Sequence, residues 1–180
     1  YSHKQLAEQA EIVKTYSNQL STDKSVMTTV LKDMKSLTKT SQIALVAGSH
    51  GSAWTESIFS SRAARSFGQD GNGTDNTITT WDMADAIADA GIKFDMVLFD
   101  ACMMGTAEVC YDFRNVAKYL IVSALDVPAP GFPYHNFMGN LYEGTVTNYI
   151  EICKSYVDYY RTYPGGWASV SLVDGNQMEG

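Results

Sequence analysis

The chain alternates between short apolar runs and longer stretches in which apolar residues recur at helical spacing. Short apolar runs bounded by turn residues are typical of buried strands, and the longer stretches are typical of amphipathic helices. The predicted strands are residues 43–48, 95–100, 119–124 and 167–173. The predicted helices are residues 3–20, 22–39, 80–90, 106–116 and 147–162. Because strands alternate with helices, we expect an α/β fold with a mostly parallel sheet and right-handed crossovers.

Polar residues and a glycine mark the ends of the predicted helices. Ser21 separates the first two helices and is a suitable N-cap for the second. Thr79, followed three residues later by Asp82, resembles a capping box, and Gly91 ends the helix that it opens. Residues 51–80 are rich in Ser, Gly, Asn and Asp and are predicted to form a long loop. A loop of this length in a compact domain tends to be functional.

Two of the predicted strands end in reactive residues. Residues 43–48 run into Ser49-His50-Gly51, and residues 95–100 run into Ala101-Cys102. Because ligands collect beyond the carboxyl ends of parallel strands, His50 and Cys102 are candidates to meet as a general base and a thiolate nucleophile. The backbone N–H groups of Gly51 and Cys102 are then candidate donors to an oxyanion. From spacing alone, a surface histidine and a packed cysteine are an open alternative.

Composition and charge narrow the classes of function. With 180 residues, of which 45% are apolar, we expect one domain, residues 1–180, around one core. A formal net charge of −7 argues against nucleic acid as a partner, and no apolar stretch reaches the roughly 18 to 20 residues of a membrane span. Cys110 and Cys153 lie among apolar neighbours and are predicted core thiols. No glycine-rich phosphate-binding motif follows a predicted strand, which disfavours a nucleotide-binding or flavodoxin-like domain.

Two sequence blocks carry a family resemblance. The first is Ser-His-Gly-Ser-Ala-Trp at residues 49–54, and the second is Phe-Asp-Met-Val-Leu-Phe-Asp-Ala-Cys-Met-Met-Gly-Thr-Ala-Glu-Val at residues 94–109. Both blocks, together with residues 111–114 and 131–134, resemble the clostripain family of cysteine peptidases over about residues 43–173. The resemblance implies a caspase-like α/β/α sandwich with a mostly parallel sheet.

The resemblance also implies roles for individual residues. It makes Cys102 the nucleophile, His50 its proton-transfer partner, and the amides of Gly51 and Cys102 the oxyanion donors. It implies cleavage of peptides after Arg or Lys, with Asp100 supplying the carboxylate of the S1 pocket. No metal or other cofactor is implied for this chemistry.

The chain departs from the family pattern in the loop at residues 126–134. Pro130 stands where family members carry an acidic residue that helps to line S1, so the preference for a basic P1 residue becomes a hypothesis. Ser123 and Asp126 are the other S1 candidates, although a solvated loop carboxylate is the simpler interpretation of Asp126. A catalytically inactive homologue that acts as a binding module is therefore the alternative function.

Two further expectations concern regulation. Enzymes of this family are commonly activated by self-cleavage in the loop after the catalytic histidine, where this chain places Arg62 and Arg65. Some family members depend on calcium, but residues 70–75 do not fit an EF-hand, because Asp75 and Trp81 occupy the positions that require Gly and Glu. We expect a polar turn there, which makes calcium a weak candidate.

The resemblance also sets expectations for the context of the chain. Family members usually have an additional N-terminal strand and a longer C-terminal portion, neither of which is evident in this sequence. The expected partners are a peptide or protein substrate and other fragments of the same chain, and the expected location is extracytoplasmic or secreted, in a bacterium.

Overall fold

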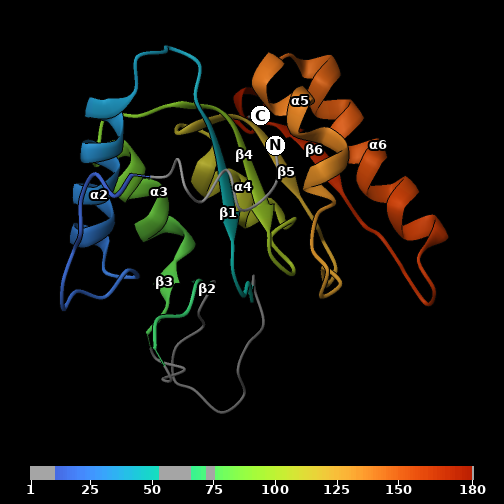
Figure 1. The fold of residues 1–180 in the computed structure, drawn as a ribbon, viewed down its shortest axis with the longest axis horizontal. Helices are drawn as coiled ribbons and strands as arrows, with labels where there is room; N and C mark the ends of the chain where they lie inside the picture. The colour runs from blue at the N-terminus through green and yellow to red at the C-terminus, as the bar shows by residue number, and fades with distance from the viewer. Residues whose placement is uncertain (1–10, 53–65, 72–75, 180) are drawn as a thin grey trace.

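A computed structural model describes residues 11–52, 66–71 and 76–179 of the chain (Figure 1). Its main sheet has four strands in the order β1-β4-β5-β6, and β2 and β3 form a separate pair. The strands are β1 (Ala44–Gly48), β2 (Ser66–Phe67), β3 (Ile78–Thr79), β4 (Phe94–Asp100), β5 (Ala117–Val122) and β6 (Ser171–Asp174). The β1–β4 and β4–β5 pairs are parallel, whereas β6 runs antiparallel to β5. The prediction of a mostly parallel sheet is confirmed.

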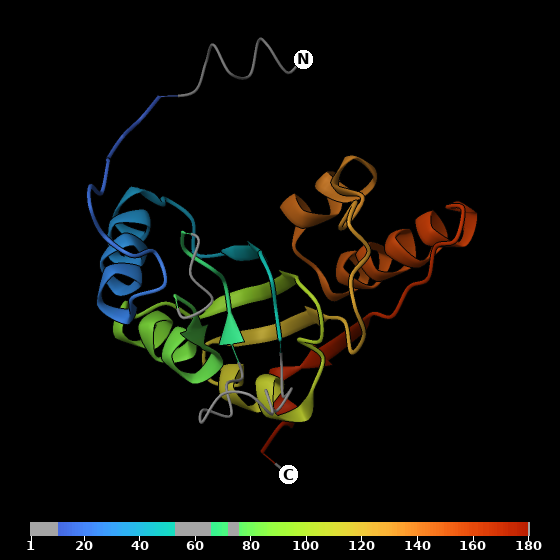
Figure 2. The ribbon, with the colours of Figure 1, turned by 90° about the horizontal axis from the view of Figure 1, so that it is seen from below.

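Helices cover both faces of the sheet, as Figure 2 shows. One layer contains α2 (Lys24–Leu37), α3 (Thr80–Asp89) and α4 (Ala107–Phe113), and the other contains α5 (Tyr134–Glu143) and α6 (Val146–Thr162). A short 3-10 turn, Gly175–Gln177, follows β6. This three-layer α/β/α arrangement is the one that the family resemblance implies.

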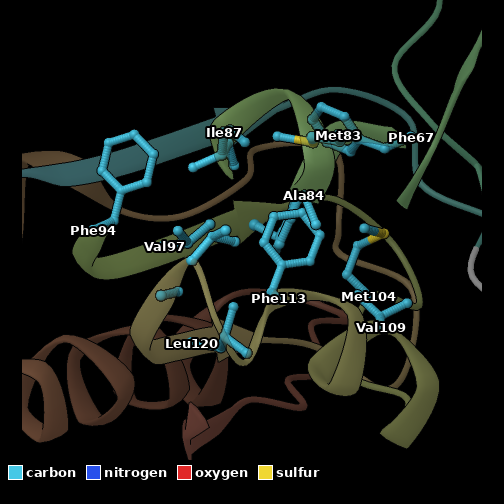
Figure 3. Close-up of a cluster of buried hydrophobic side chains, with 14 of the residues drawn as sticks. Phe67, Met83, Ala84, Ile87, Phe94, Val97, Met104, Val109, Phe113 and Leu120 are labelled. Carbon is cyan, nitrogen blue, oxygen red and sulfur yellow. The ribbon is translucent and has the colours of Figure 1, made fainter. Parts of the chain in front are cut away.

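Side chains along β4 alternate between the two helical layers, as they must in a strand. Val97 and Phe99 belong to the cluster formed with α2, α3 and α4, part of which is drawn in Figure 3. Met96 and Leu98 belong to the cluster formed with α5 and α6. Asp100 has the parity of Met96 and Leu98, so the strand directs its carboxylate toward the α5–α6 layer.

The α5–α6 layer is aromatic where it approaches the end of β4. Phe132 stacks on Tyr156 with ring centroids 4.2 Å apart, and Tyr160 meets Tyr156 edge-on at 5.0 Å. The Tyr160 hydroxyl donates to the Gly131 carbonyl at 2.7 Å. These contacts fix the loop before α5 against α6.

Strand β1 is not buried on both faces, contrary to the expectation from its apolar sequence. Ala47 is buried against the first helical layer, whereas Ala44, Val46 and Gly48 are exposed. The physical reason is that the α5–α6 cluster packs on β4 and β5, so the side chains of β1 on that face have no helical cover within the described residues.

The prediction of a helix at residues 3–20 is wrong for its described part, residues 11–20, which form no helix. Lys14 and Tyr16 instead hydrogen-bond to Asp33 of α2, and these tertiary contacts override the helical pattern. The N-cap of α2 is Asp23 rather than Ser21, since the Asp23 side chain accepts from the amides of Ser25 and Val26.

The sequence pattern missed α5, which begins directly after Pro133. An interior Gly139 and a single buried side chain, Phe137, make its helical signal weak. Packing of Phe137 edge-on against Phe132 supplies the stabilisation that the sequence lacks.

Two strand predictions had the wrong bounds: the strand predicted at 119–124 lies at 117–122, and the strand predicted at 167–173 lies at 171–174. β5 ends at Val122, since the Ser123 side chain and Leu125 form a turn. β6 therefore begins at Ser171, the residue paired with Val122, and residues 167–170 stay outside the sheet. Within the predicted loop 51–80, the two short strands β2 and β3 pair, and Gly51 forms a bridge with Phe67.

Candidate active site

His50 and Cys102 leave neighbouring strands at the same edge of the sheet. In the parallel register of β1 and β4, Gly48 lies opposite Asp100. Gly48 is two residues before His50, and Asp100 is two residues before Cys102. The Ser49 amide donates to the Asp100 carbonyl at 3.3 Å, which extends the pairing beyond the strands. His50 is exposed and Cys102 is half-buried. The strand ends that lead to His50 and Cys102 therefore lie side by side, while the pairing of the two side chains stays a prediction.

Gly51 packs directly on the backbone that carries Cys102. A methyl group on the Gly51 Cα would lie 2.5 Å from the Cys102 carbonyl oxygen and 2.9 Å from Sδ of Met104. Only glycine permits this approach. The segment that carries His50 is thus fixed against the turn that carries Cys102.

The amides of Gly51 and Cys102 are available as donors. The Ser52 amide donates to the Ser66 carbonyl at 3.1 Å, and the Gly68 amide donates to the His50 carbonyl at 3.0 Å. These bonds hold the chain on both sides of Gly51, while neither the Gly51 nor the Cys102 N–H donates a hydrogen bond to any described residue. N–H groups without an acceptor among the described residues suit the oxyanion hole that the family resemblance implies, and this role stays a prediction.

The turn after Cys102 is strained and closely packed. Met103 has a φ of 59°, a left-handed conformation that is uncommon outside glycine and clusters at functional sites. Its amide donates to the Leu125 carbonyl at 3.0 Å, and the Gly105 amide donates to the Ser123 carbonyl at 2.7 Å. These bonds tie the turn to the segment after β5 and set the direction of Cys102.

The three cysteines differ in environment. The Cys102 sulfur accepts from the Val127 amide at 3.4 Å, in the loop after β5. Burial raises the pKa of the Cys110 and Cys153 thiols to about 11. Cys110 is buried in the first apolar cluster, as predicted for a core thiol, whereas Cys153 is half-buried and packs against the second cluster. Both thiols stay protonated at neutral pH.

Asp100 points into the aromatic layer and is held by the loop before α5. Its Oδ2 accepts from the Tyr134 hydroxyl at 2.6 Å and from the Phe132 amide at 3.3 Å. Gly131 has a φ of 70°, and a methyl group on its Cα would lie 2.7 Å from Oδ2. Burial, and then the hydrogen bond to Asp100, raise the pKa of the Tyr134 hydroxyl, so it remains a protonated donor.

Ser123 and Asp126 are the other two residues predicted to line S1. Ser123 is fully buried, and its hydroxyl donates to the Leu125 carbonyl at 2.8 Å. Asp126 is exposed, and its carbonyl accepts from the Trp167 indole at 3.2 Å. Pro130 is exposed beside Gly131. The roles of Ser123 and Asp126 in S1 stay predictions.

The regulatory candidates lie partly outside the described residues. Arg62, Arg65 and residues 72–75 are not among them. Asp70 is described, and its carboxylate accepts from the Ser21 amide at 2.6 Å. Among the described residues there is no group of three or more His, Cys, Asp or Glu side chains able to hold a metal ion. Calcium dependence thus stays a prediction.

Every helix in the described part of the chain is too short or too polar to cross a membrane.

Sequence reasoning missed the tyrosines around Asp100. Tyr134 contacts its carboxylate directly, and Tyr156 lies fully buried beneath the same loop. The Tyr156 hydroxyl has no hydrogen-bond partner among the described residues. Burial, followed by the charges of Tyr160, Asp100 and Cys102, raises its pKa. The parity of Asp100 with Met96 and Leu98 was the signal that could have directed attention to this layer.

Known proteins share both the sequence and the fold of this chain. A sequence profile described as the clostripain family matches residues 2–180. Clostripain of Hathewaya histolytica is 41% identical over 59 residues, which make up 30% of this chain and 11% of clostripain. A secreted C11 cysteine protease of Bacteroides thetaiotaomicron, iotapain, is 28% identical with a TM-score of 0.77 over 92% of this chain and 48% of its own.

A second solved relative is described as an inactive zymogen. An inactive zymogen C11 protease of Parabacteroides distasonis is 26% identical, with a TM-score of 0.72 over 93% of this chain and 44% of its own. The chain thus spans about half the length of these two solved relatives. Because the family profile matches almost every residue, this chain belongs to the clostripain family.

Proposed function

We propose that the protein is a cysteine endopeptidase in which Cys102 and His50 form a catalytic dyad. The observation that carries the proposal is the register of β1 and β4, which delivers both residues to one edge of the sheet. The close packing of Gly51 on the Cys102 carbonyl supports it, because it places the two segments in direct contact. The cysteine proteases among the solved relatives agree with this chemistry.

The proposed reaction proceeds through a thioester. The Cys102 thiol passes its proton to His50, and the sulfur attacks the carbonyl carbon of the scissile peptide bond. The resulting oxyanion accepts hydrogen bonds from the N–H groups of Gly51 and Cys102. His50 then protonates the leaving amine, the C–N bond breaks, and an acyl-enzyme remains on Cys102. Water, deprotonated by His50, cleaves the thioester and releases the carboxylic acid with a free thiol.

The proposed substrate carries a basic residue at P1. Asp100 ends the strand that leads to Cys102 and directs a carboxylate beneath the site, where a cationic side chain would pair with it. Within the same proposal, the protein acts outside the cytoplasm, as does the relative described as secreted. Self-cleavage at Arg62 or Arg65 would activate it, and the inactive zymogen among the relatives is consistent with a maturation step.

A peptidase assay on the full-length protein tests this function. We expect turnover of a fluorogenic peptide with a basic P1 residue by the wild type, and none by Cys102→Ala. Cys153→Ala is the matched control, because Cys153 lies on α6 against the second apolar cluster and should not affect turnover. Equal turnover by wild type and Cys102→Ala would instead favour a different catalytic residue, and no turnover by any variant would favour the inactive binding module.

A further inference from the structure

The two oxygens of the Asp100 carboxylate are not equivalent. Oδ2 accepts two hydrogen bonds, from the Tyr134 hydroxyl at 2.6 Å and the Phe132 amide at 3.3 Å. A carboxylate oxygen has two lone-pair sites, so these donors use the acceptor capacity of Oδ2. Oδ1 accepts from no described residue. In the proposed S1 site, Asp100 therefore offers an incoming cation one oxygen rather than two.

Gly131 packs closely against both oxygens of this carboxylate. A methyl group on its Cα would lie 3.1 Å from Oδ1 and 2.7 Å from Oδ2, so any side chain at this position would press on both oxygens. The left-handed backbone of Gly131, with a φ of 70°, also disfavours any other residue. Tyr160 fixes this geometry, because its hydroxyl donates to the Gly131 carbonyl at 2.7 Å.

Lysine and arginine differ in what they require of such a carboxylate. A guanidinium gains most from a fork in which two N–H groups meet both oxygens, whereas an ammonium is a compact charge that needs only one. The adjacent Pro130 has no charge with which to supply the second acceptor. Arginine can also gain by stacking on an aromatic face, but Phe132, Tyr156 and Tyr160 are buried and packed on one another, so none of these three offers such a face.

We infer that Tyr134, together with the Phe132 amide, occupies Oδ2 of Asp100 and so makes S1 select lysine over arginine at P1. This inference rests on the proposed peptidase function and deepens it. Tyr134 acts here as a positioning residue, since it sets the acceptor geometry of Asp100 and leaves the chemistry at Cys102 unchanged.

The test compares kcat/KM for two peptides that differ only in Lys or Arg at P1, using the full-length protein. We expect the wild type to prefer lysine. Tyr134→Phe removes one donor from Oδ2, so the ratio of lysine to arginine turnover should fall by about tenfold, the effect of one charge-assisted hydrogen bond. The matched control is Tyr142→Phe, on the same helix but 82% exposed, which should leave the ratio unchanged.

The outcomes separate the inference from the function on which it rests. A wild type that cleaves after arginine as well as or better than after lysine would overturn the inference and leave the peptidase intact. An unchanged ratio in a folded Tyr134→Phe would do the same. Cleavage after neither residue would overturn both. If Tyr134→Phe fails to fold, the wild-type ratio alone still decides the preference.

Discussion

The Cα of Gly51 lies so close to the Cys102 carbonyl oxygen that a methyl group on it would stand 2.5 Å from that atom. We therefore expect Gly51→Ala to push the His50 segment away from the Cys102 turn. Because a displacement of about 1 Å in a reacting group can cost on the order of a hundredfold in rate, kcat/KM for a basic-P1 peptide should fall by at least that order. The measurement is steady-state turnover on protein whose folding is verified by circular dichroism.

Gly139→Ala is the control for this glycine substitution. Gly139 lies within α5, and a methyl group there would meet nothing within 4 Å. Since alanine favours a helix interior over glycine, stability should rise by roughly 0.5–1 kcal/mol and turnover should not change. A Gly51→Ala variant as active as Gly139→Ala would contradict the proposed contact.

Cysteine alkylation distinguishes Cys102 from the other two thiols. Cys110 and Cys153 have pKa values raised to about 11 by burial, so iodoacetamide should modify them slowly near neutral pH and faster as the pH approaches that value. Cys102 and Cys153 are both half-buried, and because the raised pKa of Cys153 slows its reaction, Cys102 should be modified first in the native protein. Peptide mapping after brief labelling at pH 7 measures this order. Equal labelling of all three cysteines in the native state would contradict it.

Tyr156 and Tyr160, two of the three buried tyrosines on α6, should respond to loss of their hydroxyls with opposite signs. The Tyr156 hydroxyl has no partner among the described residues, so Tyr156→Phe should raise the free energy of unfolding by about 1 kcal/mol. The Tyr160 hydroxyl donates to the Gly131 carbonyl, so Tyr160→Phe should lower it by roughly 1–3 kcal/mol. Urea denaturation measures both. A destabilised Tyr156→Phe would mean that its hydroxyl has a partner outside the described residues.

The sequence was most informative where local pattern and tertiary structure agree. The continuous apolar run of β4 predicted a buried strand, and the reactive residues after β1 and β4 predicted a shared site at the sheet edge. Both signals are local, because an apolar run with a sharp polar end identifies a strand and its terminus without reference to the rest of the chain.

The environment of Asp100 could not be predicted in the same way. Its contact with Tyr134 depends on a loop that is fixed by Tyr160 from another helix, and α5 has little helical signal of its own. Residues 11–20 illustrate the same limit, since bonds to Asp33 replace the helix that their spacing favours. The antiparallel direction of β6 is likewise a property of the assembled sheet.

Covalent trapping of the nucleophile tests the central claim, that Cys102 reacts with the help of His50, most directly. The measurement is the rate at which a lysine-ended peptide chloromethyl ketone labels Cys102, followed by mass spectrometry of the full-length protein. We predict one adduct, on Cys102, that forms much more slowly in His50→Ala and at the wild-type rate in His135→Ala, whose histidine is exposed on α5. An adduct on another residue, or equal labelling rates in the wild type and His50→Ala, would contradict the dyad.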